Sequence, residues 1–494
     1  MLLLGIDIGT SSIKVSVVDG VTQRCVAAAQ YPDTEREIIS YQPGWAEQSP
    51  DTWWEDVQQA ILKAHAGNRY NPHDIGAIGI SYQMHGLVLL DSEGRVLRNS
   101  IIWCDSRAVP YGDKAFEKIG EDICLQHLLN SPGNFTASKL AWVKENEPKV
   151  FASISHMMLP GDFIAQRLTG TVTATPSSLS EGILWDFQAN EVSDDVMGYF
   201  DFDRKIIPPV QPVFSLHGKL LPEVAAALSL KAGIPVTYKA GDQPNNAFSL
   251  NVVEPGEVAA TAGTSGVIYA VSDGLTFDQQ SRVNSFAHVN HLPTANRIGV
   301  LLCINGTGIL NRWIRNQAGG TVSYQQMNKL AGGVAPGSEG LRVLPFGNGA
   351  ERMLGNRLIG AHLHNIDLNK HSPAHIFRAG QEGIAFAFRY GLDIMRQNGI
   401  NPTVIRAGKA NMFLSPVFVE AFVNATGVPV ELHDNDGSVG AALGAGVGAG
   451  YFSDAADAFS RRDAANTVEP GNTDLYDELY AGWKEALQKH IPES

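Results

Sequence analysis

Two apolar runs around a short polar centre open the chain. Residues 2–8 and 13–18 are mostly apolar, and Gly9 between them supplies the backbone freedom that a tight turn needs. Thr10, Ser11 and Ser12 add hydroxyl and amide donors at the turn, the kind of concave donor cluster that holds an anion. The pattern predicts a hairpin, either a plain one with a polar tip or one that binds phosphate.

Two charged residues interrupt these apolar runs. Asp7 is an acid inside an otherwise apolar strand, which is costly unless the carboxylate has a metal ion, an amide or a lysine as partner. Lys14 brings a positive charge on the second strand. We therefore prefer the phosphate-binding interpretation, with Asp7 as an acid for the metal.

Hydrophobic spacing predicts the elements that follow. A helix is expected over residues 51–66, with Asp51 as its cap, because Trp54, Val57, Ile61 and Leu62 fall at helical spacing. The rest of the pattern predicts strands over residues 24–29, 75–80, 87–90 and 236–238, and helices over 137–146, 374–398, 437–450 and near the C-terminus. The early β-β-β-α-β order indicates a mixed α/β fold.

The second half of the chain starts a similar pattern again. Residues 257–270 form a strand–Gly-Thr-Ser–strand unit that resembles the first hairpin. A repeat more than about 200 residues away indicates a duplicated domain rather than a solenoid. We expect two lobes, residues 1–245 and 246–494, that face each other over a nucleotide with one hairpin each.

Composition narrows the function classes. A chain of 494 residues is too long for one ordinary core, and its net charge of −14 argues against nucleic-acid binding and against binding to anionic membranes. Its four cysteines are scattered without a C-x-x-C pair, which is typical of a reduced, cytoplasmic protein without a zinc site. The first apolar run is too short for a signal peptide, and no stretch approaches the ~20 apolar residues of a membrane span.

Two common nucleotide motifs are missing. No G-x-x-x-x-G-K-[ST] match occurs, so the chain is not a P-loop protein. The small residues 440–450 lack the G-x-G-x-x-G spacing of a dinucleotide fingerprint, and close helix packing explains them better.

Asp242 is the candidate catalytic residue. It follows a strand and a glycine, and Gln243 comes next. A carboxylate at a strand end can face a cleft and take a proton from a hydroxyl, and phosphoryl transfer needs such a base together with a metal and phosphate donors. The alternative is an Asp that caps a helix starting at Pro244.

Polar side chains and a tryptophan gather at two predicted strand ends, in Gln83-Met84-His85-Gly86 and in Trp103-Cys104-Asp105-Ser106-Arg107. A small polyol or sugar needs hydrogen-bond partners of both kinds and an apolar face. Taken singly, His85 is explained as a buried histidine and Trp103 as a core aromatic. Together, at neighbouring strand ends, they favour a sugar pocket.

At these residues the chain resembles the FGGY family of carbohydrate kinases, and within it most closely the xylulokinases. Residues 7–14 fit the first phosphate motif of the family, and residues 263–266 resemble the second. Residues 136–142 resemble the T-x-x-K-L-x-W signature, and residues 383–386 are similar to the long second-domain helix. The subfamily rests on residues 83–88 together with 102–107.

The resemblance implies a fold and an activity. It implies two ribonuclease-H-like domains of the actin/Hsp70/hexokinase type, with mixed sheets flanked by helices and ATP in the cleft between them. It also implies ATP-dependent phosphorylation of D-xylulose to D-xylulose 5-phosphate by in-line transfer, with Asp242 as the base. It is compatible with a homodimer.

The resemblance also assigns roles to residues. Mg²⁺ would lie near Asp7 and Asp242. The sugar site would comprise Gln83, Met84, His85, Gly86, Trp103, Asp105, Arg107, Asp242 and Gln243. ATP would be bound by Thr10, Ser11, Ser12, Lys14, Gly263, Thr264, Gly308, Asn311, Gly408 and Asn411.

Two motifs depart from the family pattern. The adenosine run of glycines appears here as residues 407–411, and the Gly-Glu-Arg loop carries an inserted alanine in residues 349–352. Three alternatives stay open: a kinase for another ketose such as ribulose, a nucleotide-dependent binding protein without sugar chemistry, and a carboxylate kinase. The last would need positive charge in the acceptor site, for which Arg107 alone is thin support.

Overall fold

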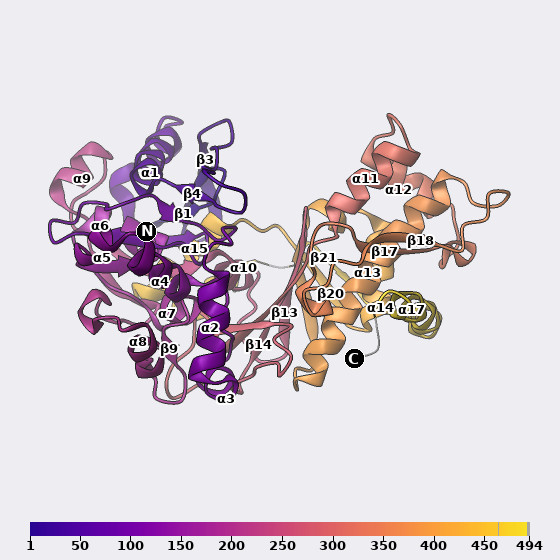
Figure 1. Ribbon diagram of the computed structural model, residues 1–494. Helices are drawn as coiled ribbons and strands as arrows, with labels where there is room; N and C mark the ends of the chain where they lie inside the picture. The colour runs from indigo at the N-terminus through magenta and orange to yellow at the C-terminus, as the bar shows by residue number, and fades with distance from the viewer. Residues whose placement is uncertain (463, 492–494) are drawn as a thin grey trace.

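The structure is a computed structural model, and it describes residues 1–462 and 464–491. It has two lobes, each built around one mixed sheet (Figure 1). The first sheet has the order β11-β12-β5-β1-β2-β3. Its strands are β1 (Leu2–Ile8), β2 (Ile13–Asp19), β3 (Arg24–Tyr31), β5 (Ile75–Tyr82), β11 (Phe214–Lys219) and β12 (Pro235–Gly241).

The second sheet repeats the arrangement of the first. Its order is β15-β16-β14-β13-β19-β20-β21. Its strands are β13 (Glu257–Ala262), β14 (Gly266–Ser272), β15 (Asn284–Ala287), β16 (Ile298–Ile304), β19 (Val404–Gly408), β20 (Val430–His433) and β21 (Asn466–Val468). In both sheets the central strand pairs antiparallel with the strand that follows it and parallel with a later one, so the expected duplication is confirmed.

Four further strand pairs complete the β-structure. They are β4 (Glu47–Gln48) with β7 (Ser100–Ile101), β6 (Val88–Leu90) with β8 (His156–Met158), β9 (Trp185–Asp186) with β10 (Glu191–Val192), and β17 (Arg342–Phe346) with β18 (Gly360–His364).

Helices cover the sheets on both sides. Those of the first half are α1 (Pro50–His65), α2 (Val109–Ile119), α3 (Glu121–Ile123), α4 (Thr136–Asn146), α5 (Pro148–Ala152), α6 (Pro160–Thr169), α7 (Pro176–Glu181), α8 (Asp194–Phe200), α9 (Pro222–Ala227) and α10 (Asp242–Ser249). Those of the second half are α11 (Gly308–Ala318), α12 (Tyr324–Gly332), α13 (Pro373–Gln397), α14 (Pro416–Thr426), α15 (Gly437–Gly448), α16 (Ala455–Phe459) and α17 (Thr473–Gln488).

Helix ends correct two expectations. Ser49, not Asp51, caps α1, because the Ser49 hydroxyl accepts the backbone N–H of Thr52 at 3.4 Å. Helix α10 begins at Asp242 itself, with Gly241 at the cap position, so an Asp cap for a helix starting at Pro244 is wrong. Asp242 is therefore the first helical residue directly after β12.

Helix α15 joins the two halves of the chain. In sequence it lies between β20 and β21 of the second sheet, but it packs on β1, β5 and β12 of the first lobe (Figure 1). A side chain in place of Gly5 or Gly79 would collide with the α15 backbone, so the strands and the helix approach as closely as the small residues predicted. Among residues 1–462 and 464–491, no helix is long and apolar enough to cross a membrane.

Candidate functional site

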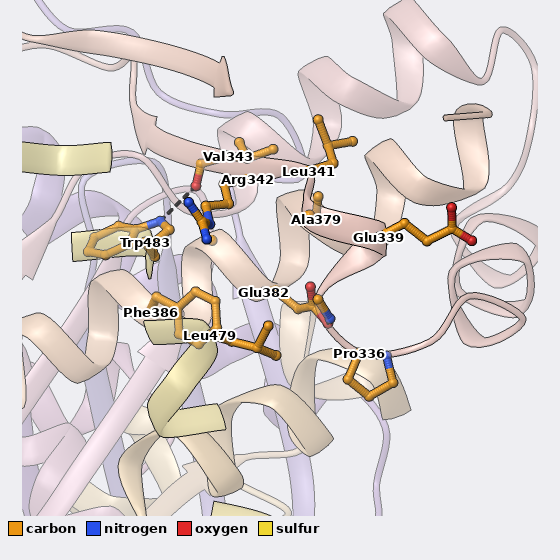
Figure 2. Close-up of a pocket in the computed structure, with 13 residues that line it drawn as sticks. Pro336, Glu339, Leu341, Arg342, Val343, Ala379, Glu382, Phe386, Leu479 and Trp483 are labelled. Atoms are coloured by element: carbon orange, nitrogen blue, oxygen red, sulfur yellow. Dashed lines mark hydrogen bonds between the residues drawn. The ribbon is translucent and has the colours of Figure 1, made fainter. Parts of the chain in front are cut away.

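A pocket within the second lobe contains none of the predicted site residues (Figure 2). Its wall includes Trp483, whose indole N–H donates to the carbonyl oxygen of Val343 at 2.9 Å. Its buried acid, Glu382, is paired with Arg378 at 2.7 Å. The predicted residues gather instead at the strand ends of the first sheet.

Three parallel strands of the first sheet end at one edge. Asp7 is in register with Ser81, and both Ile8 and Gly241 are in register with Tyr82. The chain therefore leaves β1, β5 and β12 at neighbouring points, into the first hairpin turn, the Gln83–Gly86 segment and Asp242. Sequence reasoning predicted this meeting of the phosphate, sugar and acid residues.

Asp7 and Asp242 interact electrostatically in this edge. Burial and, as a smaller contribution, the negative charge of Asp7 together raise the pKa of Asp242 to about 7. The pKa of Asp7 is itself raised by burial and by Asp436, whereas Ser81 and Lys14 lower it. Two half-buried carboxyl groups that repel each other favour a cation or a shared proton between them.

The N-terminus of α15 closes the site behind Asp7. A Cβ on Gly437 would lie 2.6 Å from an Asp7 carboxylate oxygen, so only glycine allows this approach. Asn245 of α10 donates to the carbonyl oxygen of Gly437 at 2.9 Å. The helix that begins with Asp242 and the helix beside Asp7 are thus tied to each other.

The predicted sugar residues that follow β5 lie next to Asp242. A Cβ on Gly241, the neighbour of Asp242, would lie 2.7 Å from Cγ of Met84. His85 comes next and is fixed by buried groups of α4 and α7. Gly86 packs against Pro160, since a Cβ there would lie 2.7 Å from the proline ring. Met84 and His85 therefore form one wall of the candidate site.

Thr10 links the phosphate hairpin to the sugar wall. Its hydroxyl accepts the indole N–H of Trp103 at 3.0 Å and donates to the Gln83 side chain at 3.3 Å. Gln83 in turn donates to Gln48 at 3.0 Å, and Gln48 donates to the Thr10 carbonyl at 2.7 Å. The Gln83 amide is thus engaged inside the protein, whereas the Trp103 ring is 53% exposed.

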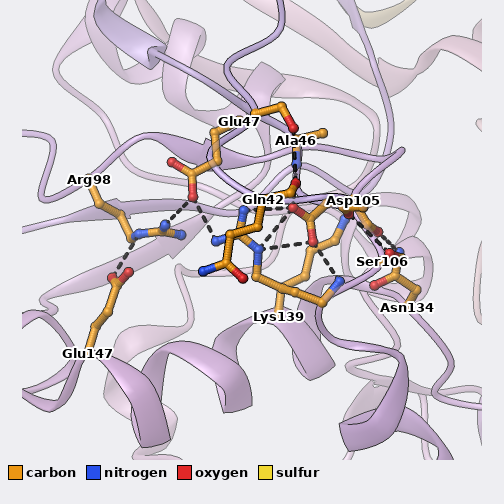
Figure 3. Close-up of polar contacts among 12 residues, drawn as sticks. Gln42, Ala46, Glu47, Arg98, Asp105, Ser106, Asn134, Lys139 and Glu147 are labelled. Carbon is orange, nitrogen blue, oxygen red and sulfur yellow. Dashed lines mark hydrogen bonds and ion pairs between the residues drawn. The ribbon is translucent and has the colours of Figure 1, made fainter.

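Asp105 and Arg107 lie close together because they form an ion pair with each other. Figure 3 shows Asp105 in this network. Arg107 pairs with Asp105 and with Glu47, both at 2.7 Å, and its guanidinium lies 3.8 Å from the centre of the Trp45 ring. Asp105 also accepts the backbone N–H of Ala46 at 2.6 Å. This buried network leaves little polar capacity for a ligand, and a sugar contact by either side chain stays a prediction.

The second hairpin is fastened to α11. The backbone N–H groups of Gly308 and Ile309 donate to the carbonyl oxygens of Gly263 and Thr264 at 2.9 and 3.1 Å. A Cβ on Gly263 would lie 3.5 Å from the side-chain nitrogen of Asn411. Residues predicted to hold phosphate and adenosine from three separate segments therefore meet here.

Asn311 and Gly408 are two further residues predicted to bind the nucleotide. Asn311 is buried, and its side-chain oxygen has no hydrogen-bond partner among the described residues. Gly408 lies beside Asn435, which donates to Asn246 of α10 at 2.9 Å. Gly408 is thus linked through Asn435 to the helix of Asp242.

The remaining hairpin residues are accessible. The turn is closed by a hydrogen bond from the Gly9 N–H to the Ser12 carbonyl oxygen at 3.1 Å. Ser11 and Lys14 are exposed, and Gln243 is half-buried. These side chains are free to face a ligand.

Two buried acids were missing from the predicted residues. Glu351 accepts the N–H groups of Asn305 and Gly306, just before α11, at 3.0 and 3.2 Å, and burial raises its pKa to about 7. Glu181 lies behind His85 and Gly241. The sequence marks Glu351 through its Gly-Glu-Arg loop, whereas nothing in the serine-rich segment around Glu181 indicates a site.

Comparison with known proteins identifies the family of this chain. Family models for the N-terminal and C-terminal domains of the FGGY family of carbohydrate kinases match residues 2–249 and 258–450. The chain is 29% identical to a xylulose kinase of Bacillus subtilis, over 98% of this chain and 96% of the relative. It is 32% identical to a xylulose kinase of Escherichia coli, over 90% of this chain and 88% of the relative.

A solved structure shows the same fold. The crystal structure of xylulose kinase from Rhodospirillum rubrum superposes with a TM-score of 0.88 at 25% identity, covering 99% of this chain and 98% of the other. The expected two-domain α/β fold is confirmed. With family models matching both halves and a relative above 30% identity, the chain belongs to the FGGY family of carbohydrate kinases.

Proposed function

We propose that this protein phosphorylates the terminal hydroxyl of D-xylulose with ATP, giving D-xylulose 5-phosphate and ADP. The observation that carries the proposal is the half-buried Asp242, which follows a glycine packed against Met84 and interacts electrostatically with Asp7. A protein that only binds a nucleotide has no need of such an acid beside a polyol pocket. The xylulose kinases among the relatives support the choice of sugar.

In this proposal Asp242 accepts the proton of the sugar hydroxyl as that oxygen attacks the γ-phosphorus in line. A general base works best when its pKa lies near the working pH, and burial raises the pKa of Asp242 to about 7. The proton moves to the Asp242 carboxylate, the new O–P bond forms, and the bond to the leaving ADP oxygen breaks. Burial raises the pKa of Asp7 above its ordinary value, and the hydrogen bond with Ser81 and the positive charge of Lys14 partly oppose this rise.

The donor set around Asp242 fits Mg²⁺. Hard carboxylate oxygens are the ligands that Mg²⁺ prefers, and it binds through one or two carboxylates plus phosphates and water. Asp7 and Asp242 would hold the ion, largely through water. When bound, Mg²⁺ neutralises charge on the phosphates.

Donors for the phosphates come from both hairpins in this proposal. Thr10, Ser11, Ser12 and Lys14 serve on the first, and Gly263 and Thr264 on the second, beside Gly308. Asn311, Gly408 and Asn411 would hold the adenosine. Closure of the lobes on the sugar would exclude water and limit wasteful ATP hydrolysis.

The acceptor site also disfavours carboxylate substrates. Arg107, the cation that the sequence offered for such a substrate, is 8% exposed and already pairs with Asp105 and Glu47. Asp7, Asp242 and Glu181 add acid rather than positive charge. A neutral polyol therefore suits this site better than a sugar acid.

The test is coupled ADP release with D-xylulose, D- and L-ribulose, glycerol and gluconate measured side by side. We expect the highest kcat/KM with D-xylulose. A strong preference for a ribulose would show that the protein is a sugar kinase whose substrate is that ribulose and not D-xylulose. ADP release that no acceptor stimulates would overturn the proposal in favour of a binding protein.

A further inference from the structure

His85 has a backbone conformation that a residue with a side chain adopts only when its surroundings hold it. Its φ angle is +63°, in the left-handed region. Such a conformation costs free energy and persists at sites where neighbouring groups fix it. The groups that hold His85 are therefore part of how the candidate sugar wall is built.

Helices α4 and α7 supply these groups. The carbonyl oxygen of His85 accepts hydrogen bonds from Nζ of Lys139 at 2.8 Å and from the Thr136 hydroxyl at 3.3 Å. The backbone N–H of His85 donates to Oε2 of Glu181 at 3.3 Å. All three partners are buried. Both main-chain polar groups of His85 are thus satisfied by side chains from other elements.

The imidazole ring is fixed as well. Its Nδ1 lies 2.9 Å from the backbone carbonyl oxygen of Glu181. Because a carbonyl oxygen only accepts, Nδ1 carries the proton and Nε2 is left as an acceptor. The ring packs edge-on against Phe135, with centres 4.8 Å apart, and near Phe286 of β15 in the second sheet. Its orientation is therefore set from both halves of the chain.

The charge state agrees with this hydrogen-bond pattern. Burial lowers the pKa of His85 to about 3, so its ring is neutral at neutral pH. Burial raises the pKa of Glu181 well above its ordinary value. A neutral imidazole keeps one acceptor nitrogen for a ligand.

Glu181 is also held from behind. Its Oε1 accepts the hydroxyl of Tyr82 at 2.7 Å. Its Oε2 would lie 3.3 Å from a Cβ on Gly241, directly before Asp242. One buried carboxyl group therefore contacts the end of β5, the segment that carries His85 and the residue before the candidate base.

We propose that Glu181 is a positioning residue of the sugar site, which fixes His85 so that Nε2 accepts a hydrogen bond from a sugar hydroxyl. The proposal rests on the proposed function for the identity of the sugar. It assigns Thr136 and Lys139 the matching task at the His85 carbonyl. A hydroxyl can donate to Nε2 and a carboxylate cannot, so the arrangement selects polyols.

The test compares two substitutions of Glu181. Glu181→Met keeps the length of the side chain and removes both acceptors, whereas Glu181→Gln keeps one carbonyl oxygen. We expect Glu181→Met to raise KM for D-xylulose about 10- to 100-fold and Glu181→Gln to raise it less, with KM for ATP within about twofold in both. Glu223→Gln, at an exposed glutamate of α9, is the matched control and should change neither constant.

A second measurement reads the ring directly. Nitrogen-15 NMR of histidine-labelled protein, with the His85 signal assigned by its loss in His85→Asn, should show the Nδ1–H tautomer in the wild type. Glu181→Met should keep this tautomer, because the partner of Nδ1 is the backbone carbonyl oxygen of residue 181. A wild-type Nε2–H tautomer, or a folded Glu181→Met with unchanged KM for D-xylulose, would overturn the positioning role. If the wild type does not use D-xylulose, the proposed function fails while the tautomer of the unliganded protein still decides this inference.

Discussion

The two hairpins share a backbone plan but differ in charge. In the first, Asp7 lies in register with Lys14 beside the turn. At the corresponding place in the second, Thr261 lies in register with Val267. Both domains therefore keep the turn that can bind phosphate. Of the two turns, the first has an acidic and a basic side chain beside it, and the second has neither at the corresponding positions.

The hairpins also differ in what holds them. Asp7 of the first faces Gly437 at the start of α15 and is repelled by Asp242 and Asp436. The second gives its turn carbonyls to the N–H groups that begin α11. In the proposed function, the first hairpin would supply the charged groups of the reaction and the second would position the nucleotide through its backbone.

Removing the negative charge of Asp7 from the first hairpin should cause the largest loss of activity among the changes to the two hairpins. Asp7→Asn removes the metal-side acid without changing its size, and we expect kcat to fall about 10²- to 10³-fold at saturating ATP and Mg²⁺. Thr261→Val at the corresponding place of the second hairpin is the control. Equal losses in the two variants would contradict the division of tasks between the hairpins.

Separating the second hairpin from α11 should affect nucleotide binding instead. A Cβ on Gly308 would collide with the carbonyl oxygen of Gly263, so Gly308→Ala must displace the turn or the helix. We expect KM for ATP to rise about tenfold with KM for D-xylulose nearly unchanged. Gly332→Ala, where the new Cβ makes an ordinary contact at 3.8 Å, should leave both constants as in the wild type.

The pH dependence of kcat/KM should also depend on the negative charge of Asp7, with a smaller effect than the two substitutions above. Asp242 must be ionised to accept a proton, and its pKa is raised to about 7, so kcat/KM should fall as pH drops below 7 and approach a tenfold loss per unit. The negative charge of Asp7 contributes to the raised pKa of Asp242. The acid limb of the residual activity of Asp7→Asn should therefore lie at lower pH than in the wild type, and an unshifted limb would argue against the coupling.

Much of this arrangement could be predicted from the sequence because local patterns carry it. Asp7 is conspicuous as an acid in an apolar strand, and Asp242 follows a strand and a glycine. Parallel strands bring their ends to one edge of a sheet, so the meeting of Asp7, Met84 and Asp242 follows once the strands are recognised.

Other features depend on partners that no local pattern reveals. Arg107 resembles a ligand-binding cation in sequence, but Asp105, Glu47 and the Trp45 ring occupy it in the structure. Glu181 is about 100 residues from His85 along the chain, and only tertiary packing brings the two together. Whether such residues bind a ligand or stabilise the structure depends on the residues that surround them in the fold.

The thermal stability of Asp242→Asn shows whether this variant is folded like the wild type. An acid whose pKa is raised in the folded protein stabilises it at low pH and loses that contribution as pH rises through about 7. Asp242→Asn removes this cost, so at pH 8 we expect its Tm to be equal to or a few degrees above that of the wild type. A lower Tm would show that the substitution disturbs the fold.

The most direct test of the account is the turnover of Asp242→Asn with D-xylulose and ATP. We predict that kcat falls about 10²- to 10⁴-fold, while the Kd of D-xylulose measured by calorimetry stays within about threefold of the wild type. Near-normal turnover in this variant would contradict the assignment of Asp242 as the base.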